Sequence, residues 1–279
     1  MMRAAIRGLR ACVDWTRAAR GTRAARLPAR VSMVVLGFGL LLVLPVAGRA
    51  AELHVISGGA AKAAVAPLTE AFASSQGVSV KLEFAPMGVI AQRLARGDVF
   101  DVLIMTPEAL KGVREQGRLA ATPALSLARV GIGVAVHEDS PLPDISTVAA
   151  LRATLLNARS VVYIDPRIGT SGAYVVEAFD RMGIRDAMAA KSVLGTGGEV
   201  VEPVGHGEIE LGLHQITEIL PVKGVRLVGE LPRELQHYTD YVAAIGRDSA
   251  VPELARRLID ALRSESARSV YQRAGFVTP

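Results

Sequence analysis

Short apolar runs alternate with amphipathic segments from residue 52 onward, and this alternation constrains the fold more than any other feature of the sequence. The run "ELHVIS" precedes a helix expected from about residue 62 to 75, in which Val65, Leu68 and Phe72 follow helical spacing. The pattern then repeats, with strands expected over 78–84 and 100–105 and helices over 88–97 and 107–119. Strands that alternate with helices predict βα units and a parallel sheet.

A second α/β group follows, and two long β-prone stretches bracket it. Its apolar segments are 160–165, 171–184, 208–215 and 225–231, and helices over 251–262 and 267–274 finish the chain. The bracketing stretches lie at 128–136 and 238–246. We therefore predict an α/β fold of two Rossmann-like lobes with mixed sheets, joined by a two-strand hinge. Lobe 1 would comprise 51–130 plus 242–279, lobe 2 would comprise 131–241, and a cleft would lie between them.

Residues 1–50 differ in composition from the rest of the chain. They hold nine arginines and a single acidic residue, Asp14. Residues 31–50 place a basic flank, a short apolar core and the small residues Gly48 and Ala50 in the order of a secretory signal peptide. A membrane anchor is the alternative, but the apolar run 34–46 is shorter than the ~20 residues of a spanning helix. We expect cleavage near Ala50 and a location in the periplasm, while the start codon, Met1 or Met33, stays open.

Removal of this segment changes the charge and the available chemistry. The whole chain carries +5 and residues 1–50 carry +8, which leaves −3 for residues 51–279 and no electrostatic basis for binding nucleic acid. The cysteine, Cys12, and the tryptophan, Trp15, both lie in the leader, so the mature chain could form neither a disulfide nor a thiolate nucleophile. The remaining histidines show no zinc spacing, and no phosphate-binding loop or serine elbow is present. We expect no metal and no cofactor.

Two turns are candidates for binding an anion. In "ISGGAAKA" a strand ends at Ser57, Gly58, Gly59 and Ala60, where a helix begins. Glycine there either provides backbone freedom for a turn or lets bare N–H groups approach an anion. In "RIGTSGAY" the hydroxyls of Thr170 and Ser171, beside Gly172, stand where a helix N-cap would lie, which is again a terminus suited to an anion.

Further residues could contact a ligand, each with a structural alternative. Met87 and Gly88 begin the second helix, where the methionine could pack on a ligand's carbon skeleton or fill the core. Thr106 could bind a ligand or cap the helix that begins at Pro107. Arg167 could hold a carboxylate through two hydrogen bonds or lie in solvent on its loop.

His214 and Gln215 end a strand inside the expected cleft. Gln215 is a candidate ligand contact, and His214 is either a base or a structural side chain. An enzyme that moves a proton would need a base near the cleft, and Glu199, His214 and Lys62 are the candidates.

Four blocks of the sequence resemble a known family: "HVISGGAAKA", "EFAPMGVIAQRLARGDVFDVLIMTPEAL", "YIDPRIGTSGAYVVEAFDRMGI" and "SVYQRAGF". They are similar to the periplasmic solute-binding proteins of ABC uptake systems, in particular the molybdate-binding group, across nearly all of 51–279. The resemblance implies a type II periplasmic binding fold that holds a small anion at helix N-termini and hydroxyls. It also implies a monomer that delivers this anion to an ABC permease in the membrane.

The sequence departs from the molybdate-binding pattern at the expected ligand positions. Ala60 stands in place of the first-turn serine, Pro86-Met87-Gly88 in place of consecutive serines, and Gln215 near the late tyrosine. Without those side chains a tetrahedral dianion would be held by backbone N–H groups, each contributing about 1 kcal/mol net, which argues against molybdate itself. The ligand, a molybdate-like oxyanion, tungstate or an organic carboxylate, stays open. The segments "ARSVVYID", "GLHQITEILPV" and "LVGELP" are similar to a subgroup that includes aconitate isomerases. Two functions therefore stay open: anion binding for uptake, or an isomerase that shifts an allylic proton on a tricarboxylate.

Overall fold

The computed structural model describes residues 52–197 and 199–278, which lie within one compact unit, Ala47–Pro279. The expected signal peptide, residues 1–50, lies outside the described residues. Across the described residues, the helices are too short or too polar to cross a membrane.

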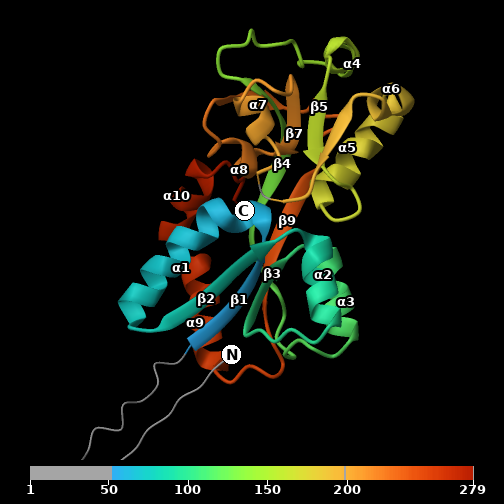
Figure 1. Cartoon of the computed structure of the whole chain (residues 1–279). Coiled ribbons are helices and arrows are strands. Elements are labelled where there is room, and N and C mark those ends of the chain that lie inside the picture. Colours follow the sequence, from blue (N-terminus) through green and yellow to red (C-terminus); the bar gives the residue numbers. More distant parts are fainter. Residues whose placement is uncertain (1–51, 198, 279) are drawn as a thin grey trace, which may run out of the picture. The chain divides into compact units, whose positions relative to one another are not determined.

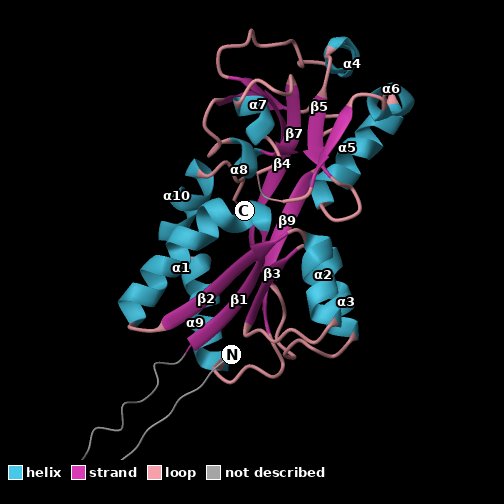
Figure 2. Ribbon diagram, in the orientation of Figure 1, coloured by secondary structure: helices cyan, strands magenta, loops and turns pink. Residues whose placement is uncertain are grey.

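The first lobe is built on a mixed sheet of five strands (Figures 1 and 2). β1 (Glu52–Gly58) lies between β2 (Ser79–Ala85) and β3 (Val102–Met105), and both neighbours run parallel to it. β9 (Tyr238–Ile245) pairs antiparallel with β3, and the N-terminal part of β4 (Leu125–His137) pairs antiparallel with β9. The parallel strands are joined through helices, as the alternation in the sequence predicts.

Helices cover both faces of this sheet (Figure 1). On one face α1 (Lys62–Gln76), α9 (Pro252–Leu262) and α10 (Glu265–Arg273) pack on Leu53 and Val55 of β1. On the other face α2 (Met87–Ala95) and α3 (Pro107–Glu115) pack on Ile56. Alternate strand residues point to opposite faces, so β1 contributes to both hydrophobic cores.

The second lobe continues from β4 (Figures 1 and 2). The C-terminal part of β4 pairs antiparallel with β7 (Leu211–Gln215) on one side and with β8 (Val225–Glu230) on the other. β5 (Val161–Ile164) runs parallel to β7 and to β6 (Ser192–Gly195). The longer helices α4 (Val148–Asn157) and α5 (Thr170–Arg181) pack with α6 (Arg185–Ala189) on one face. The short helices α7 (Glu202–Gly205) and α8 (Ile216–Ile219) pack on the other.

Two strands connect the lobes. β4 pairs with β9 up to Gly131 and with β7 from Ile132, so it passes from the first sheet into the second. β9 pairs with β4 from Tyr238 to Ala243 and with β3 from Val242 to Ile245, so it returns the chain to the first lobe. The predicted fold class, two α/β lobes with mixed sheets joined by two strands, is confirmed. The exact lobe bounds stay a prediction, because the described residues form one compact unit.

Most expected elements lie within a few residues of their predicted positions. The helix expected to reach residue 119 ends at Glu115, because Gly117 has a positive φ of 66° that a helix cannot continue through. Residues 185–207 form α6, β6 and α7, and residues 216–219 form α8, none of which was predicted from the sequence. These elements are four or five residues long, too short to show a periodic pattern.

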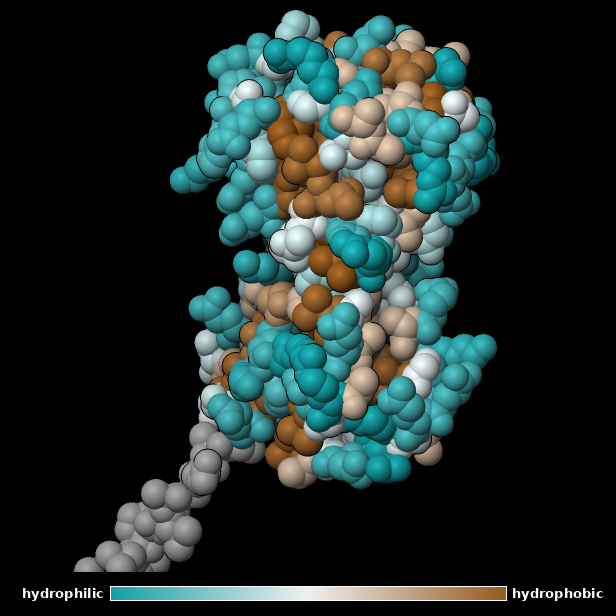
Figure 3. Space-filling model, turned by 45° about the vertical axis from the view of Figure 1, so that its right-hand side comes forward, coloured by the Kyte–Doolittle hydropathy of each residue, from teal (hydrophilic) through white to brown (hydrophobic). Residues whose placement is uncertain are grey.

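Figure 3 shows one face of the molecule, on which hydrophilic side chains cover most of both lobes and hydrophobic ones reach the surface in patches. The exposed large hydrophobic side chains include Val193 and Leu194 of the edge strand β6. Folded proteins always expose some apolar surface, so these residues alone do not mark a binding site.

Candidate functional site

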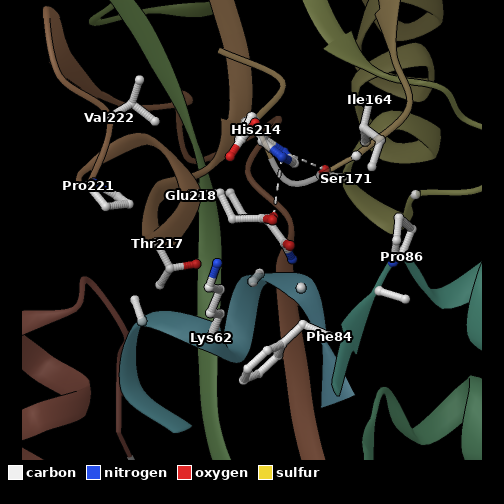
Figure 4. Close-up of a pocket in the computed structure, with 18 of the residues that line it drawn as sticks. Lys62, Phe84, Pro86, Ile164, Ser171, His214, Thr217, Glu218, Pro221 and Val222 are labelled. Atoms are coloured by element: carbon white, nitrogen blue, oxygen red, sulfur yellow. Dashed lines mark hydrogen bonds and ion pairs between the residues drawn. The ribbon is translucent and has the colours of Figure 1, made fainter. Parts of the chain in front are cut away.

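A cavity of about 790 Å³ lies between the two lobes, and Figure 4 shows the side chains that project into it. Its floor comes from the start of α1, the end of β2 and Tyr241 of β9. Its roof comes from the start of α5, the segment after β6, and the stretch from the end of β7 through α8. Both lobes therefore contribute to one site, at the ends of strands where α/β sheets bind ligands.

The helices that begin at the cavity have uncapped N-termini. The 3-10 turn η1 (Gly59–Ala61), which leads into α1, has no side-chain cap, and neither do α2 and α5. By contrast, the hydroxyl oxygens of Thr106, Thr147 and Ser264 accept from backbone N–H groups of α3, α4 and α10, away from the cavity. First-turn N–H groups at an uncapped terminus are left to water or to an anion.

α5 begins one residue earlier than the sequence suggested. Its N-cap is Gly169, so Thr170 and Ser171 are the first helical residues and their hydroxyls do not cap the helix. Both line the cavity. Ser171 is only 2% exposed, and its hydroxyl is directed to another side chain in the wall.

That side chain is His214, which lies between Ser171 and Glu218 (Figure 4). His214 Nδ1 is 3.1 Å from Ser171 Oγ, and His214 Nε2 is 3.2 Å from Glu218 Oε2. The second contact is close but poorly aligned, so Nε2 makes no well-directed hydrogen bond within the described residues. The three side chains form a chain that we call the Ser171–His214–Glu218 relay.

Burial controls the protonation of the relay. It lowers the pKa of His214 to about 4, so this imidazole is neutral at neutral pH. It raises the pKa of Glu218 to about 8, although the positive charge of Lys62 opposes the shift. Glu218 is therefore mostly a protonated carboxyl at pH 7, and it can gain or lose a proton close to that pH.

Two other buried groups in the cavity wall have no hydrogen-bond partner among the described residues. They are the Gln215 amide nitrogen Nε2 and the Thr217 hydroxyl. Tyr241 Oη donates to Gln215 Oε1 at 3.4 Å, and burial raises the pKa of this tyrosine, so it stays a donor. The amide oxygen is thus occupied while the NH₂ group is free. A buried donor without a partner is costly unless water or a ligand satisfies it.

Gly59 provides the space for Glu218. A Cβ atom at Gly59 would lie 3.1 Å from Glu218 Oε1, closer than ordinary van der Waals contact. At Gly58 a Cβ would overlap the end of the Met87 side chain, and at Gly172 it would overlap the Ile164 carbonyl oxygen. Gly59 therefore shapes the cavity, while Gly58 and Gly172 serve close packing.

A backbone hydrogen bond joins the two lobes beside the cavity. Gly88 N–H, at the start of α2, donates to the carbonyl oxygen of Ile168 at 2.9 Å. A Cβ at Gly88 would lie 2.9 Å from Ile168 Cα, so this contact requires glycine. The structure thus shows the lobes in contact around the cavity.

Other parts of the wall are apolar. Phe84 and Met87 line the cavity from the first lobe, and Pro221 and Val222 line it from the second lobe, where Figure 4 shows Pro221 beside Thr217. A ligand here would meet both hydrogen-bond donors and carbon surface.

Several candidates from the sequence do not line the cavity. Ser57 is fully buried and donates to the carbonyl of its neighbour Gly58. Thr106 caps α3 by accepting from Ala109 N–H, which is the structural alternative stated above. Arg167 is 82% exposed at its side chain, and its Nε lies 3.0 Å from both carboxylate oxygens of Asp165.

Gly58, Gly88 and Gly172 do not line the cavity either. The candidates that do line it are Gly59, Ala60, Lys62, Met87, Thr170, Ser171, Glu199, His214 and Gln215. Glu218, Thr217 and Tyr241 also line the cavity and were not predicted from the sequence. His214 and Glu218 are four residues apart across a strand–helix junction, a spacing that could have drawn attention to the pair. No cluster of three potential metal ligands occurs among residues 52–197 and 199–278.

Comparisons with known proteins agree with this architecture. The model for the family of bacterial extracellular solute-binding proteins matches residues 53–277. An aconitate isomerase from a Pseudomonas species is 32% identical over 255 residues, covering 88% of this chain and 96% of that protein. The molybdate-binding protein ModA of Escherichia coli K12 is 22% identical over 251 residues, covering 85% of this chain and 95% of ModA.

A solved structure shows the same fold. The periplasmic molybdate-binding protein of Azotobacter vinelandii superposes with a TM-score of 0.70 at 16% identity, covering 81% of this chain and 99% of that one. The residues matched by the family model, 53–277, span both lobes and the two connecting strands. The chain therefore belongs to the family of bacterial extracellular solute-binding proteins.

Proposed function

We propose that the cavity binds a small organic anion with two or more carboxylates. The free donors of Gln215 and Thr217 and the uncapped N-termini of η1, which leads into α1, and of α5 offer hydrogen bonds to negatively charged oxygens. Lys62 adds a positive charge, and Figure 4 shows its side chain pointing toward Thr217 and Glu218.

The size and the apolar wall favour an organic ligand over a tetrahedral oxyanion. About 790 Å³ lies within the range of pockets that enclose organic molecules. Phe84 and Met87 would pack on a carbon skeleton, which molybdate lacks. Ala60 and Met87 have no hydroxyl where the molybdate-binding pattern has serines, which also favours an organic ligand over molybdate.

We further propose that the protein is an isomerase of the aconitate isomerase type. The observation that carries this is the contact of Glu218 with His214 inside the cavity, because an ionisable carboxyl with a pKa near 8 suits proton transfer at neutral pH. The ionised carboxylate would take a proton from the CH₂ group next to the double bond. The double bond would move by one carbon, and the proton would return at the far end of the allyl system. The reaction moves one proton and one double bond, so it needs no oxidant, reductant or cofactor.

The second candidate is delivery of the same anion to an ABC permease by an exported, monomeric binding protein. The hydrogen bond from Gly88 to Ile168 favours this candidate, because contacts of this kind hold two lobes closed around a ligand. A binding protein that releases the ligand unchanged needs no catalytic group. Another relative, from Bacillus subtilis, is described as a putative ABC transporter substrate-binding lipoprotein. The family relationship is compatible with either candidate.

Proton NMR in D₂O distinguishes the two. Purified protein is incubated with cis- or trans-aconitate, and conversion and deuterium uptake are followed, with Glu218→Gln as the comparison. Conversion by the wild type that is lost in Glu218→Gln supports the isomerase. Binding of aconitate by calorimetry without conversion supports delivery. Binding of molybdate without binding of any carboxylate refutes both.

A further inference from the structure

The neutral imidazole of His214 can be arranged between its neighbours in two ways. It carries one N–H and one lone pair, and these face Ser171 and Glu218 at 3.1 and 3.2 Å. If the hydrogen is on Nδ1, it is donated to Ser171 Oγ, and the lone pair on Nε2 lies close to Glu218. A protonated Glu218 suits this arrangement, because an ionised carboxylate would repel the lone pair. The Ser171 hydroxyl hydrogen is then free to point into the cavity.

If the hydrogen is instead on Nε2, it lies close to an ionised Glu218, which attracts it although the 3.2 Å contact is poorly aligned. Nδ1 must then accept from the Ser171 hydroxyl. In that arrangement Ser171 presents only oxygen lone pairs to the cavity, which would repel an anion. Burial of both side chains leaves little room for water to provide alternative partners, since His214 is 1% and Ser171 is 2% exposed.

We propose that His214 is a positioning residue that transmits the protonation of Glu218 to Ser171, so that Ser171 donates to an anionic ligand only while Glu218 is protonated. The inference rests on the proposed binding of an anion in this cavity. Glu218 then sets the affinity for the ligand and also carries the proton in the proposed reaction. Binding of the anion is therefore linked to binding of a proton by Glu218.

Other charged groups act on Glu218 and must be separated from the relay. Lys62 on α1 lowers the pKa of Glu218, and the charge of Glu218 raises the pKa of Tyr241 on β9. The cavity is also lined by Glu199, Glu202, His206 and Lys223. An ionised Glu218 would repel an anion directly, without His214, so a fall in affinity at high pH alone does not test the relay.

The first test uses the full mature protein without ligand. Imidazole ¹⁵N NMR of wild type and Glu218→Gln is recorded from one pH unit below to one unit above the Glu218 pKa of about 8. We expect the hydrogen of His214 to move from Nδ1 to Nε2 with rising pH in the wild type, and no change in Glu218→Gln. A single tautomer across this range in the wild type would overturn the proposal.

The second test measures affinity for propane-1,2,3-tricarboxylate, a saturated tricarboxylate that cannot be isomerised. At pH 7 we expect Ser171→Ala to weaken binding about tenfold or more, the loss of one hydrogen bond to a charged group. At pH 9 the same substitution should change the affinity less than twofold. In the Glu218→Gln background its effect should be equal at both pH values. Because the wild type and the variant are compared at the same pH, the charge state of the ligand cancels from each ratio of affinities.

The outcomes separate this inference from the proposed function. If the wild type binds no tricarboxylate at either pH, the proposed function fails, and the tautomer measurement still decides whether the relay operates. If the tricarboxylate binds and Ser171→Ala has the same effect at pH 7 and pH 9, direct repulsion by Glu218 is sufficient and the relay is refuted.

Discussion

Replacement of Glu218 by glutamine should stabilise the protein at high pH and leave its stability nearly unchanged at low pH. Burial raises the pKa of Glu218 from 4.5 to about 8, so the folded state binds this proton more tightly than the unfolded state does. Stability is therefore fully present below pH 4.5 and is lost as the pH rises toward 8. Glutamine has the shape of the protonated carboxyl and does not titrate.

The magnitude follows from the size of the shift. Each pKa unit corresponds to ~1.4 kcal/mol, which would give roughly 5 kcal/mol for the whole shift. The side chain is 13% exposed to the cavity, where water can solvate the charge, so we take about half of this, roughly 2–3 kcal/mol. For a chain of this size that amounts to a difference in Tm of roughly 5–10 °C at pH 8 and above.

Urea unfolding of wild type and Glu218→Gln between pH 5 and pH 9 would measure this difference. His214 also titrates, and because burial lowers its pKa to about 4, stability falls in both proteins as the pH drops below 6.5. The difference between the two curves isolates Glu218. Glu199→Gln, which removes an exposed carboxylate from the same cavity, is the matched control. Parallel curves for wild type and Glu218→Gln from pH 5 to pH 9 would refute a buried, protonated Glu218.

Three further predictions concern the cap, the contact between the lobes and the ligand. Thr106→Ala should lower the free energy of unfolding by about 1 kcal/mol, because it removes the cap of α3, and should leave tricarboxylate affinity unchanged by calorimetry. Gly88→Val should prevent the contact with Ile168, so small-angle scattering with ligand present should give a larger radius of gyration than for the wild type. In a melting screen at a hundredfold excess over Kd, a tricarboxylate should add about 2.7 kcal/mol, or roughly 5–10 °C, and molybdate should add less. Stabilisation by molybdate alone would contradict the assignment of an organic ligand.

Much of the fold could be predicted because its signals are local. The order of strands and helices follows from apolar runs such as 100–105 and from the helical spacing of Val65, Leu68 and Phe72. Both turns that the sequence marked as candidates, around Gly59 and Ser171, do line one cavity. Arg167 shows the limit of this reasoning, because a neighbour two residues away, Asp165, holds its guanidinium outside the cavity.

The Ser171–His214–Glu218 relay depends on contacts between distant parts of the chain. Ser171 and His214 are 43 residues apart, and Gly59, which leaves space for Glu218, comes from the other lobe. Nothing in the residue type of Glu218 indicates that it is protonated near pH 7; its pKa is raised because segments of both lobes exclude water from it. The α/β alternation, the two connecting strands and the helix starts could be predicted from the sequence, since propensity and spacing act within a few residues. Which polar groups are buried together could not, because desolvation and hydrogen-bond direction depend on how the two lobes pack against each other.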